Sequence, residues 1–569
     1  MQKIKEIIAK KITEIISNTG YKTDEDEILS FIDIPVDSKM GDLALPCFKL
    51  ARIMRSAPPK IALELKESIG ELPFIKRVEA VGGYLNFFVD AFYYKELLDR
   101  ILFDADYGRS EVGRGKVVCL DFSSCNIAKR FHVGHIGSTT IGNALRNIYA
   151  FCGYKCVAIN HLGDWGTNFG KMIAAYKLYS RKEKVDERGI NELVDIYVRF
   201  NDEEKKNNAL SDMARNAFTK LENGDEEYLE IWQYFKDISI KEYNKTYELL
   251  GISFDSYNGE AFFSDKIPGV IEELRQKNLL EKDNGAFIVR LEDYNLTNTV
   301  VLKSDGSSLY VARDIAAAIW RKKEYDFDKC IYVTSAGQSL HFAQCFKIVE
   351  LMGYEWSKNL VHVPYGTMSI NGEKLASRTG NVIHLDDLLA ESISKCEKII
   401  EEKNAELKDK KSVARAVGVG AIIFNALANS RIKDTNFVWE EALSFEGNTG
   451  PYVQYTYARS SSVLRKAGMD SVDDVKTAYP DLSSEEITLV KKLSEFPAAV
   501  NRALEENEPS VIARYTLALC SDFNQFYHNC PILRSEGAAR AFRLKLTKCV
   551  RKVLGVSLDL LGMKRTEEI

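Results

Sequence analysis

The chain has 569 residues, too many for one hydrophobic core, and this length predicts about three domains. Hydrophobic residues make up 45% of the chain and charged residues 28%, and its apolar runs are much shorter than a membrane span. The formal net charge of −5 gives no general electrostatic case for a nucleic-acid partner, so any RNA contact must be local.

The first sixteen residues and the cysteines indicate the compartment. The segment MQKIKEIIAKKITEII reads as an amphipathic helix rather than a signal peptide or a transit peptide. The 11 cysteines form no disulfide framework, and the C-x3-C pair Cys152 and Cys156 has no second ligand pair at zinc spacing. We therefore expect a cytoplasmic protein with reduced thiols, no membrane association and no zinc.

Residues 1–112 are expected to form a small α+β domain. Strand-like composition occurs at 31–36 and 77–90, and Gly82-Gly83 interrupts the second stretch as a hairpin turn would. Helical stretches lie between them, and Gly41-Asp42 is interpreted as the start of a helix over 41–52.

Residues 113–390 are expected to form a Rossmann-like catalytic domain. Strand-like runs at 117–122, 156–161, 329–334 and 361–364 alternate with helices, which is typical of a doubly wound parallel sheet. A charged helical insertion at about 171–250 interrupts the alternation and is short for an editing domain, so no editing site is predicted. Residues 391–569 carry helical periodicity and predict an all-α C-terminal domain. The fold class is therefore multidomain α/β.

The segment DFSSCNIAKRFHVGHIGSTTIGNALR, residues 121–146, predicts a strand end, a polar turn at 123–131 and a helix from His132 onward. His132 and His135 lie three residues apart, on one face of the first helical turn. Free N–H groups at a helix N-terminus suit a triphosphate, and Gly134 leaves room for a flat ring. For an arbitrary pair of histidines, a cap or a core role would be the better interpretation.

The His-x-Gly-His pattern, preceded by Asn126-Ile127-Ala128-Lys129, resembles the HIGH signature of class I aminoacyl-tRNA synthetases in its arginyl form. The resemblance implies ATP with Mg²⁺, L-arginine and tRNA(Arg) as substrates. It implies that Lys129, His132 and His135 stabilise phosphates and that Gly134 contacts ATP. Cys125 and Arg130 stand where the family often has proline, and Gly137 where it often has arginine.

The segment NGEKLASRTGNV, residues 371–382, follows the last expected strand and carries Lys374 and Arg378. It resembles the KMSKS loop of class I synthetases, with Ser377 where the family has a second lysine. A lysine over the phosphates stabilises negative charge that develops in the transition state, so Lys374 is predicted to be catalytic and Arg378 to bind ATP. Many arginyl-tRNA synthetases lack the second lysine and use one at the position of Lys129.

Recognition of arginine calls for carboxylates and oriented acceptors. DGSSLYVARD (305–314) and YVTSAGQSLHFAQ (332–344) resemble segments of the family that bind arginine. The resemblance implies arginine contacts for Tyr310, Asp314 and Gln338 at the guanidinium side, and for Asp121 and Asn126 nearer the turn. The family commonly has glutamate at the position of Asp121. HLGDWGTNFG (161–170) also matches and is expected to shape the pocket floor.

The C-terminal domain is expected to bind the anticodon. FEGNTGPYVQYTYAR (445–459) resembles the family, and Tyr452 and Gln454 there are candidate tRNA contacts. Asn524 and Tyr527 form a second candidate patch. Since aromatic rows are more often core, burial of Tyr455 or Tyr457 is expected. The basic segment 543–565 is a candidate for backbone phosphates or a solvated helix face.

We interpret the chain as an arginyl-type synthetase and expect it to be a monomer. The family resemblance implies that arginine activation requires tRNA. Two alternatives stay open at this point. One is a class I synthetase for another amino acid, and the other is a synthetase-like RNA-binding protein that has lost catalysis.

Overall fold

The computed structural model describes residues 1–35, 37, 40–304, 306–307, 309–374, 383–468 and 482–569. The described chain divides into two compact units. The first comprises Met1–Tyr107, Ser460–Pro497 and Ala518–Val553, and the second comprises Gly108–Arg459, Ala498–Leu517 and Leu554–Ile569. The expected domain boundaries at 112 and 390 remain predictions, because this division follows contacts rather than sequence order.

The N-terminal part of the first unit is an α+β fold. Its elements are α1 (Gln2–Asn18), α2 (Glu25–Phe31), β1 (Leu43–Pro46), α3 (Ala51–Met54), α4 (Pro58–Ile69), β2 (Ile75–Val81), β3 (Tyr84–Val89) and α5 (Ala91–Phe103). The strands form an antiparallel sheet in the order β1-β3-β2, and the β2–β3 hairpin turns at Gly82-Gly83 as expected. Helix α1 buries Ile4, Ile8 and Ile12 at a spacing of four, which places them on one face.

Two expectations for this part were wrong. Phe31 ends helix α2, and within 31–36 only a bridge from Asp33 to Ala44 is described as sheet pairing. Gly41-Asp42 precedes a strand rather than opening a helix. Asp42 accepts hydrogen bonds from the Val89 amide at 2.6 Å and the Tyr94 hydroxyl at 2.8 Å. These long-range contacts make Asp42 a packing residue, not a helix cap.

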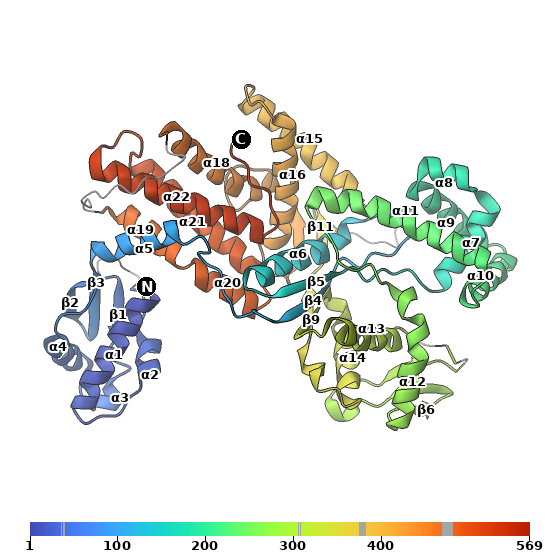
Figure 1. The fold of residues 1–569 in the computed structure, drawn as a ribbon, viewed down its shortest axis with the longest axis horizontal. Helices are drawn as coiled ribbons and strands as arrows, with labels where there is room; N and C mark the ends of the chain where they lie inside the picture. Colours follow the sequence, from blue (N-terminus) through green and yellow to red (C-terminus); the bar gives the residue numbers. More distant parts are fainter. Residues whose placement is uncertain (36, 38–39, 305, 308, 375–382, 469–481) are drawn as a thin grey trace. The chain divides into compact units, whose positions relative to one another are not determined.

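The catalytic sheet of the second unit is parallel, with strand order β10-β9-β4-β5. Its strands are β4 (Val117–Asp121), β5 (Lys155–Ile159), β9 (Lys329–Ser335) and β10 (Leu360–Tyr365). All lie within one or two residues of the predicted runs. Helix α6 (Ile136–Phe151) contacts β4, β5 and β9, whereas α13 (Tyr310–Tyr325) contacts β4 and α14 (Ser339–Leu351) contacts β10 (Figure 1). The predicted Rossmann-like sheet is therefore confirmed.

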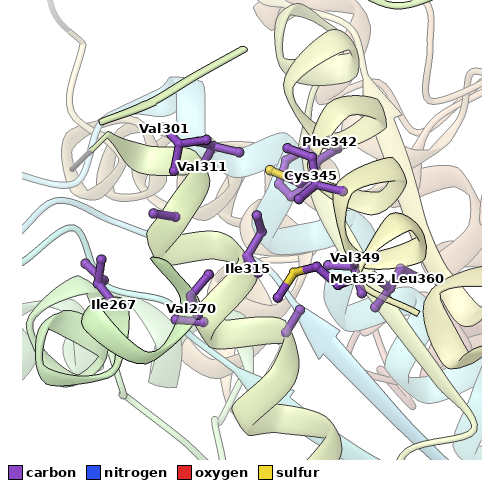
Figure 2. Close-up of a cluster of buried hydrophobic side chains, with 14 of the residues drawn as sticks. Ile267, Val270, Val301, Val311, Ile315, Phe342, Cys345, Val349, Met352 and Leu360 are labelled. Carbon is purple, nitrogen blue, oxygen red and sulfur yellow. The ribbon is translucent and has the colours of Figure 1, made fainter. Parts of the chain in front are cut away.

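One face of this sheet is sealed by a hydrophobic cluster in which Cys119 and Cys330 of the strands meet Ile315 of α13 and Val349 of α14. Figure 2 shows Ile315, Val349 and Met352 pointing toward one another between the two helices. Helix α12 (Ile267–Gln276) closes the cluster, together with an unpredicted antiparallel sheet of β6 (Glu281–Asp283), β7 (Ala286–Val289) and β8 (Thr299–Leu302). This packing fixes α13 and α14 beside the carboxyl ends of β4 and β9.

The predicted insertion is helical. It comprises α7 (Thr167–Tyr179), α8 (Lys182–Arg188), α9 (Ile190–Glu204), α10 (Asn208–Glu222) and α11 (Glu226–Leu250). These helices have a core of their own, in which Phe169, Phe200 and Phe235 are at most 5% exposed. The insertion is thus a packed helical body attached to the sheet through α7 and α11.

The chain after residue 383 is largely helical, as predicted. Its helices are α15 (Leu385–Lys403), α16 (Lys410–Leu427), α17 (Trp439–Ala442), α18 (Gly450–Lys466), α19 (Ser484–Ser494), α20 (Phe496–Glu505), α21 (Ser510–Asn529) and α22 (Gly537–Leu560). A short strand, β13 (Thr435–Phe437), pairs with β11 (Met368–Ile370), which also pairs with β12 (Glu373–Lys374). Among the helices described, none is long and apolar enough to cross a membrane.

Candidate active site

The turn after β4 has an unusual backbone. Ser123, Ser124 and Ala128 adopt positive φ angles of 70°, 48° and 59°, which residues with a side chain rarely do. Asn126 pairs with Gly163, and a Cβ atom on Gly163 would lie 1.9 Å from the Asn126 Oδ1 atom. Any side chain at 163 would therefore displace the amide of Asn126, and glycine lets that amide keep its position.

Helix α11 of the insertion braces this turn from the other side. The Tyr243 hydroxyl lies 2.6 Å from the carbonyl oxygens of both Asn126 and Lys129. The amide of Ala128 donates to Ser239 Oγ at 2.8 Å. The insertion therefore positions the polar turn, a role that its charged helical sequence did not reveal.

The two histidines stand at the start of α6, as predicted, but a 3-10 turn, Val133–His135, precedes the α-helix. The Gly134 amide donates to His132 Nδ1 at 3.1 Å, and the two imidazole centroids are 3.8 Å apart. Burial, together with the neighbouring His132, lowers the pKa of His135 to about 3. Burial also lowers the pKa of His132, helped by His384 and Lys129. Both rings are therefore neutral at pH 7 and can offer polar N–H contacts to a phosphate without carrying a charge.

A cavity of about 440 Å³ opens beside this turn. Every residue predicted to bind arginine lines it: Asp121, Asn126, Tyr310, Asp314 and Gln338. Asp121 ends β4 and Asn126 belongs to the turn, whereas Tyr310 and Asp314 are on the first turns of α13 and Gln338 directly precedes α14. Segments separated by more than two hundred residues thus meet at one edge of the sheet, which is where ligands bind in doubly wound folds.

Three acidic side chains of the cavity have different partners. Asp121 Oδ2 lies 2.8 Å from Nη2 of Arg321, which is 1% exposed, and its Oδ1 accepts from Ser124 Oγ. Glu260 is paired with Arg313 at 3.0 Å, although burial still raises the pKa of Glu260 to about 7.

The third acidic side chain is different. Asp314 Oδ2 lies 2.6 Å from Nε2 of His341, and among the side chains that the structure describes, which leave out 373–382 and 469–481, no lysine or arginine is its ion-pair partner. Because Asp121 and Glu260 are each already paired with an arginine of the protein, Asp314 is the acidic group best placed to receive an external cation. The sequence pattern predicted Asp314 as a ligand of arginine. It did not indicate that Glu260, Arg313, Arg321 and His341 would lie around it.

A second, narrower cavity of about 130 Å³ lies beside Gly134. Gly137 and Gly366 also line it, and a Cβ atom on Gly137 would lie 2.9 Å from the Tyr365 ring. Gly137, which replaces an arginine common in the family, therefore leaves room for Tyr365. Met368 and Ile136 supply apolar walls, so the slot suits a flat ring.

Of residues 371–382, the segment that resembles the KMSKS loop, the structure describes only residues 371–374. Lys374 ends β12, but its side chain lies outside the described part of the structure, as do Arg378 and Ser377. Downstream, His132 and His384 form an antiparallel bridge, and the Val133 amide donates to the Ile383 carbonyl at 3.1 Å. The segment that follows the loop is thus bound directly to the first signature.

Arg130 strengthens this connection. Its Nη2 lies 2.6 Å from Asp386 Oδ2 and 3.1 Å from Asp387 Oδ1, both in the first turn of α15. Arg130, where the family often has proline, therefore ties the polar turn to the start of the helix that follows the loop. Lys129 beside it is exposed and lines a further cavity of about 150 Å³ with Trp165 and Tyr197.

Comparisons with known proteins agree with this arrangement. Residues 98–439 match the model of the family described as "tRNA synthetases class I (R), catalytic domain". Residues 2–89 match "Arginyl tRNA synthetase N terminal domain" and residues 453–569 match "DALR anticodon binding domain". The chain belongs to the arginyl-tRNA synthetase family. The family predicted from the sequence is confirmed, and a class I family for another amino acid is excluded.

Individual arginyl-tRNA synthetases resemble it over their whole length. An arginine–tRNA ligase of Alkaliphilus metalliredigens is 46% identical over 98% of this chain and 99% of its own. One of Clostridium perfringens is 47% identical over 99% of this chain and 100% of its own. The solved structure of Thermus thermophilus arginyl-tRNA synthetase superposes with a TM-score of 0.79 at 26% identity, covering 99% of both chains.

The candidate tRNA contacts of the helical region differ in exposure. Tyr527 on α21 is 42% exposed, and Tyr452 and Asn524 are partly exposed. Gln454 is fully buried, and its amide donates to the carbonyls of Ala416 and Lys564 at 3.1 and 2.9 Å. Gln454 is therefore an interior residue, and we withdraw it as an RNA contact.

Other features of the helical region also turn out to be structural. Tyr457 is 3% exposed, as expected for one of the aromatic residues of α18. Much of the basic segment 543–565 is paired within the protein. Arg543 contacts Glu486 at 2.7 Å, Lys545 contacts Asp99 at 3.2 Å, Lys552 donates to the Ile101 carbonyl at 2.9 Å, and Arg565 pairs with Asp559. These internal contacts weaken the case for a basic surface that binds RNA phosphates.

Proposed function

We propose that this enzyme joins L-arginine to tRNA(Arg) through an arginyl-adenylate intermediate. The observation that carries the proposal is the cavity at the carboxyl edge of the sheet, where Asp121, Asn126, Tyr310, Asp314 and Gln338 meet beside the His132–His135 turn. A cation with planar hydrogen-bonding geometry suits an acidic cavity of this kind.

Asp314 binds the guanidinium group of arginine in this proposal. Asp121 and Glu260 are paired with Arg321 and Arg313, so their carboxylates shape the cavity and hold its walls. Asn126, at the turn, supplies a polar group for the amino and carboxylate end of the substrate, and Gln338, directly before α14, supplies one at the guanidinium side. Tyr310 stands over the opening, where it is 66% exposed.

ATP enters with Mg²⁺ as its own counterion, and its base occupies the slot at Gly134 and Gly137. An oxygen of the arginine carboxylate attacks the α-phosphorus, and the bond to the bridging oxygen breaks to release pyrophosphate. His132 and His135 contact the phosphates as neutral donors, while Lys129, Lys374 and Arg378 supply positive charge to the transition state. No covalent intermediate with the protein is needed.

In the second step, a ribose hydroxyl of the terminal adenosine of tRNA attacks the arginyl carbonyl carbon, and AMP leaves. We assign Tyr452, Asn524 and Tyr527 to the anticodon contacts, since each has a polar side chain that is partly exposed on α18 or α21. We also propose that activation requires tRNA, as the family resemblance implies. The cytoplasmic location, the monomeric state and the lack of a zinc cofactor remain predictions.

The proposal is tested by pyrophosphate exchange with each of the amino acids, run with and without tRNA. We expect exchange with arginine in the presence of tRNA(Arg) and little without it. Exchange with glutamate but not with arginine would overturn the arginine assignment. No exchange with any amino acid, with or without tRNA, would favour the alternative of an RNA-binding protein that has lost catalysis.

A further inference from the structure

A group of metal-binding side chains lies at the wall of the arginine cavity. Asp314 comes from α13, and His341 and Cys345 come from α14, where a spacing of four residues places them on one face. One donor atom from each residue lies within 4.8 Å of the other two. Figure 2 shows Cys345 beside Phe342 on the side of α14 that faces the cluster.

The separations of the donor atoms fit a small tetrahedral cation. His341 Nε2 lies 3.6 Å from Cys345 Sγ. Zinc bonds of roughly 2.1 Å to nitrogen and 2.3 Å to sulfur separate those donors by about 3.6 Å in a tetrahedral site. The same geometry separates nitrogen from a carboxylate oxygen by about 3.4 Å, compared with the 2.6 Å between His341 Nε2 and Asp314 Oδ2. The Asp314 carboxylate must therefore move about 0.8 Å away from His341 Nε2, and its oxygen already lies within 4.8 Å of Cys345 Sγ.

The type and the exposure of the donors select the cation. A thiolate, an imidazole and a carboxylate favour Zn²⁺ or Cd²⁺, whereas Mg²⁺ favours oxygen ligands and the phosphates of ATP. The His341 and Asp314 side chains are 29% and 25% exposed and line the cavity, and Cys345 is 3% exposed behind them. A cation therefore reaches the site through the arginine cavity, and a fourth ligand, water, completes the shell from that side.

We propose that Asp314, His341 and Cys345 form an inhibitory site for a soft divalent cation such as Zn²⁺. Binding breaks the hydrogen bond in which His341 Nε2 donates to Asp314, so the proton of the neutral ring moves to Nδ1 and frees Nε2 for the cation. The thiol proton of Cys345 is released to solvent. The cation coordinates the carboxylate of Asp314 and so places positive charge where the guanidinium group of arginine would bind. The inhibitory role rests on the proposed function, because it requires arginine and the cation to compete for Asp314.

Metal binding is tested without any assay of activity. The full-length reduced protein is titrated with Co²⁺ or Cd²⁺, and the thiolate-to-metal charge-transfer absorption is recorded. We expect one band in the wild type and in the Cys396→Ala control, which removes an equally buried thiol from α15. The band is expected to be absent in Cys345→Ala. An equal band in Cys345→Ala, or no band in the wild type, would overturn the site.

Competition is tested next. Saturating arginine should suppress the Co²⁺ band, and Zn²⁺ should raise the KM for arginine at least tenfold in tRNA-dependent pyrophosphate exchange, with reversal by a chelator. Cys345→Ala and Cys345→Ser should each need at least tenfold more Zn²⁺ for the same inhibition, with unchanged circular dichroism as the control for folding. A band that persists under saturating arginine would overturn the inhibitory role. Failure of the proposed function would instead appear as the absence of arginine-dependent exchange in metal-free protein.

Discussion

The carboxylate of Asp121 forms an ion pair with the guanidinium of Arg321 beneath the arginine cavity, with 2.8 Å between Oδ2 and Nη2. The two side chains are 8% and 1% exposed. Arg321 also lies 3.3 Å from His161 Nδ1, and its charge centre stands 5.4 Å from the Tyr332 ring. The pair joins the end of β4 to α13, which are the two elements that carry Asp121 and Asp314. An internal arginine thus stabilises a site whose ligand is arginine.

Removal of Arg321 should destabilise the protein strongly. Arg321→Met leaves the buried carboxylate of Asp121 without its partner, and we expect the free energy of unfolding to fall by about 3–5 kcal/mol, measured by urea denaturation. Arg199→Met, at an exposed pair with Glu203, should change the free energy of unfolding far less, because solvent screens the pair. Adding Asp121→Asn to Arg321→Met should recover part of the loss. Equal stabilities of Arg321→Met and Arg199→Met would refute a structural role for the buried pair.

Lys129 should matter for adenylate formation at least as much as Lys374. Ser377 stands where the family has a second lysine in the loop, so the charge at Lys129 has to stabilise the phosphates. We expect Lys129→Ala to lower the single-turnover rate of adenylate formation by about 10²–10³-fold. Lys205→Ala, at an exposed helical pair with Asp202, serves as the control. A Lys129→Ala rate near that of the wild type would remove the assigned role.

Arg130 should affect ATP rather than arginine. Because its guanidinium holds Asp386 and Asp387 at the start of α15, Arg130→Ala weakens the link between this helix and the turn that carries the histidines. The backbone contacts of His132 and Val133 with His384 and Ile383 remain. We expect a rise of about tenfold in the KM for ATP, equivalent to about 1.4 kcal/mol, with the KM for arginine changed less than twofold. Arg130→Lys should recover part of the effect. Equal changes in both KM values would indicate a general loss of structure instead.

The neutral state of His135 predicts a dependence of stability on pH. Its pKa falls from 6.5 to about 3 on folding, chiefly through burial. Between these values the unfolded chain binds more protons, so stability decreases as the pH falls from 6.5 toward 3. His135→Gln should therefore flatten the slope of unfolding free energy between pH 6.5 and 5 by at most about 1.4 kcal/mol per pH unit. His528→Gln, at an exposed position, is the control, and identical slopes in wild type and His135→Gln would contradict the prediction.

The strands of the catalytic sheet could be predicted because each is a short apolar run with a clear boundary. Lys329–Ser335 and Leu360–Tyr365 follow this pattern closely. The strand Leu43–Pro46 could not be predicted, because Gly41-Asp42 has the local pattern of a helix start. The role of Asp42 depends on Val89 and Tyr94, which lie about fifty residues away and become neighbours only in the folded sheet.

Prediction of the candidate site from the sequence is limited in the same way, because long-range contacts leave no local pattern. The residues expected to bind arginine meet in one cavity because three short segments carry recognisable patterns. The partners of those residues carry no local pattern. In the sequence, Arg321 looks like any basic residue near the end of a helix, and Glu260 looks like any surface glutamate. Their roles become visible only in the folded protein, where Arg321 meets Asp121 and Glu260 meets Arg313. Gln454 was misassigned because an amide beside tyrosines gives no sign of its burial.

Discrimination between arginine and citrulline shows whether the charge of Asp314 selects arginine. Citrulline matches arginine in shape but is neutral, so it would leave the carboxylate unpaired. We expect the wild type to prefer arginine by a factor of at least about 10³ in kcat/KM for tRNA charging, and Asp314→Asn to lose most of that preference through a higher KM for arginine. Comparable charging of both substrates by the wild type, or an unchanged preference in Asp314→Asn, would contradict the claim.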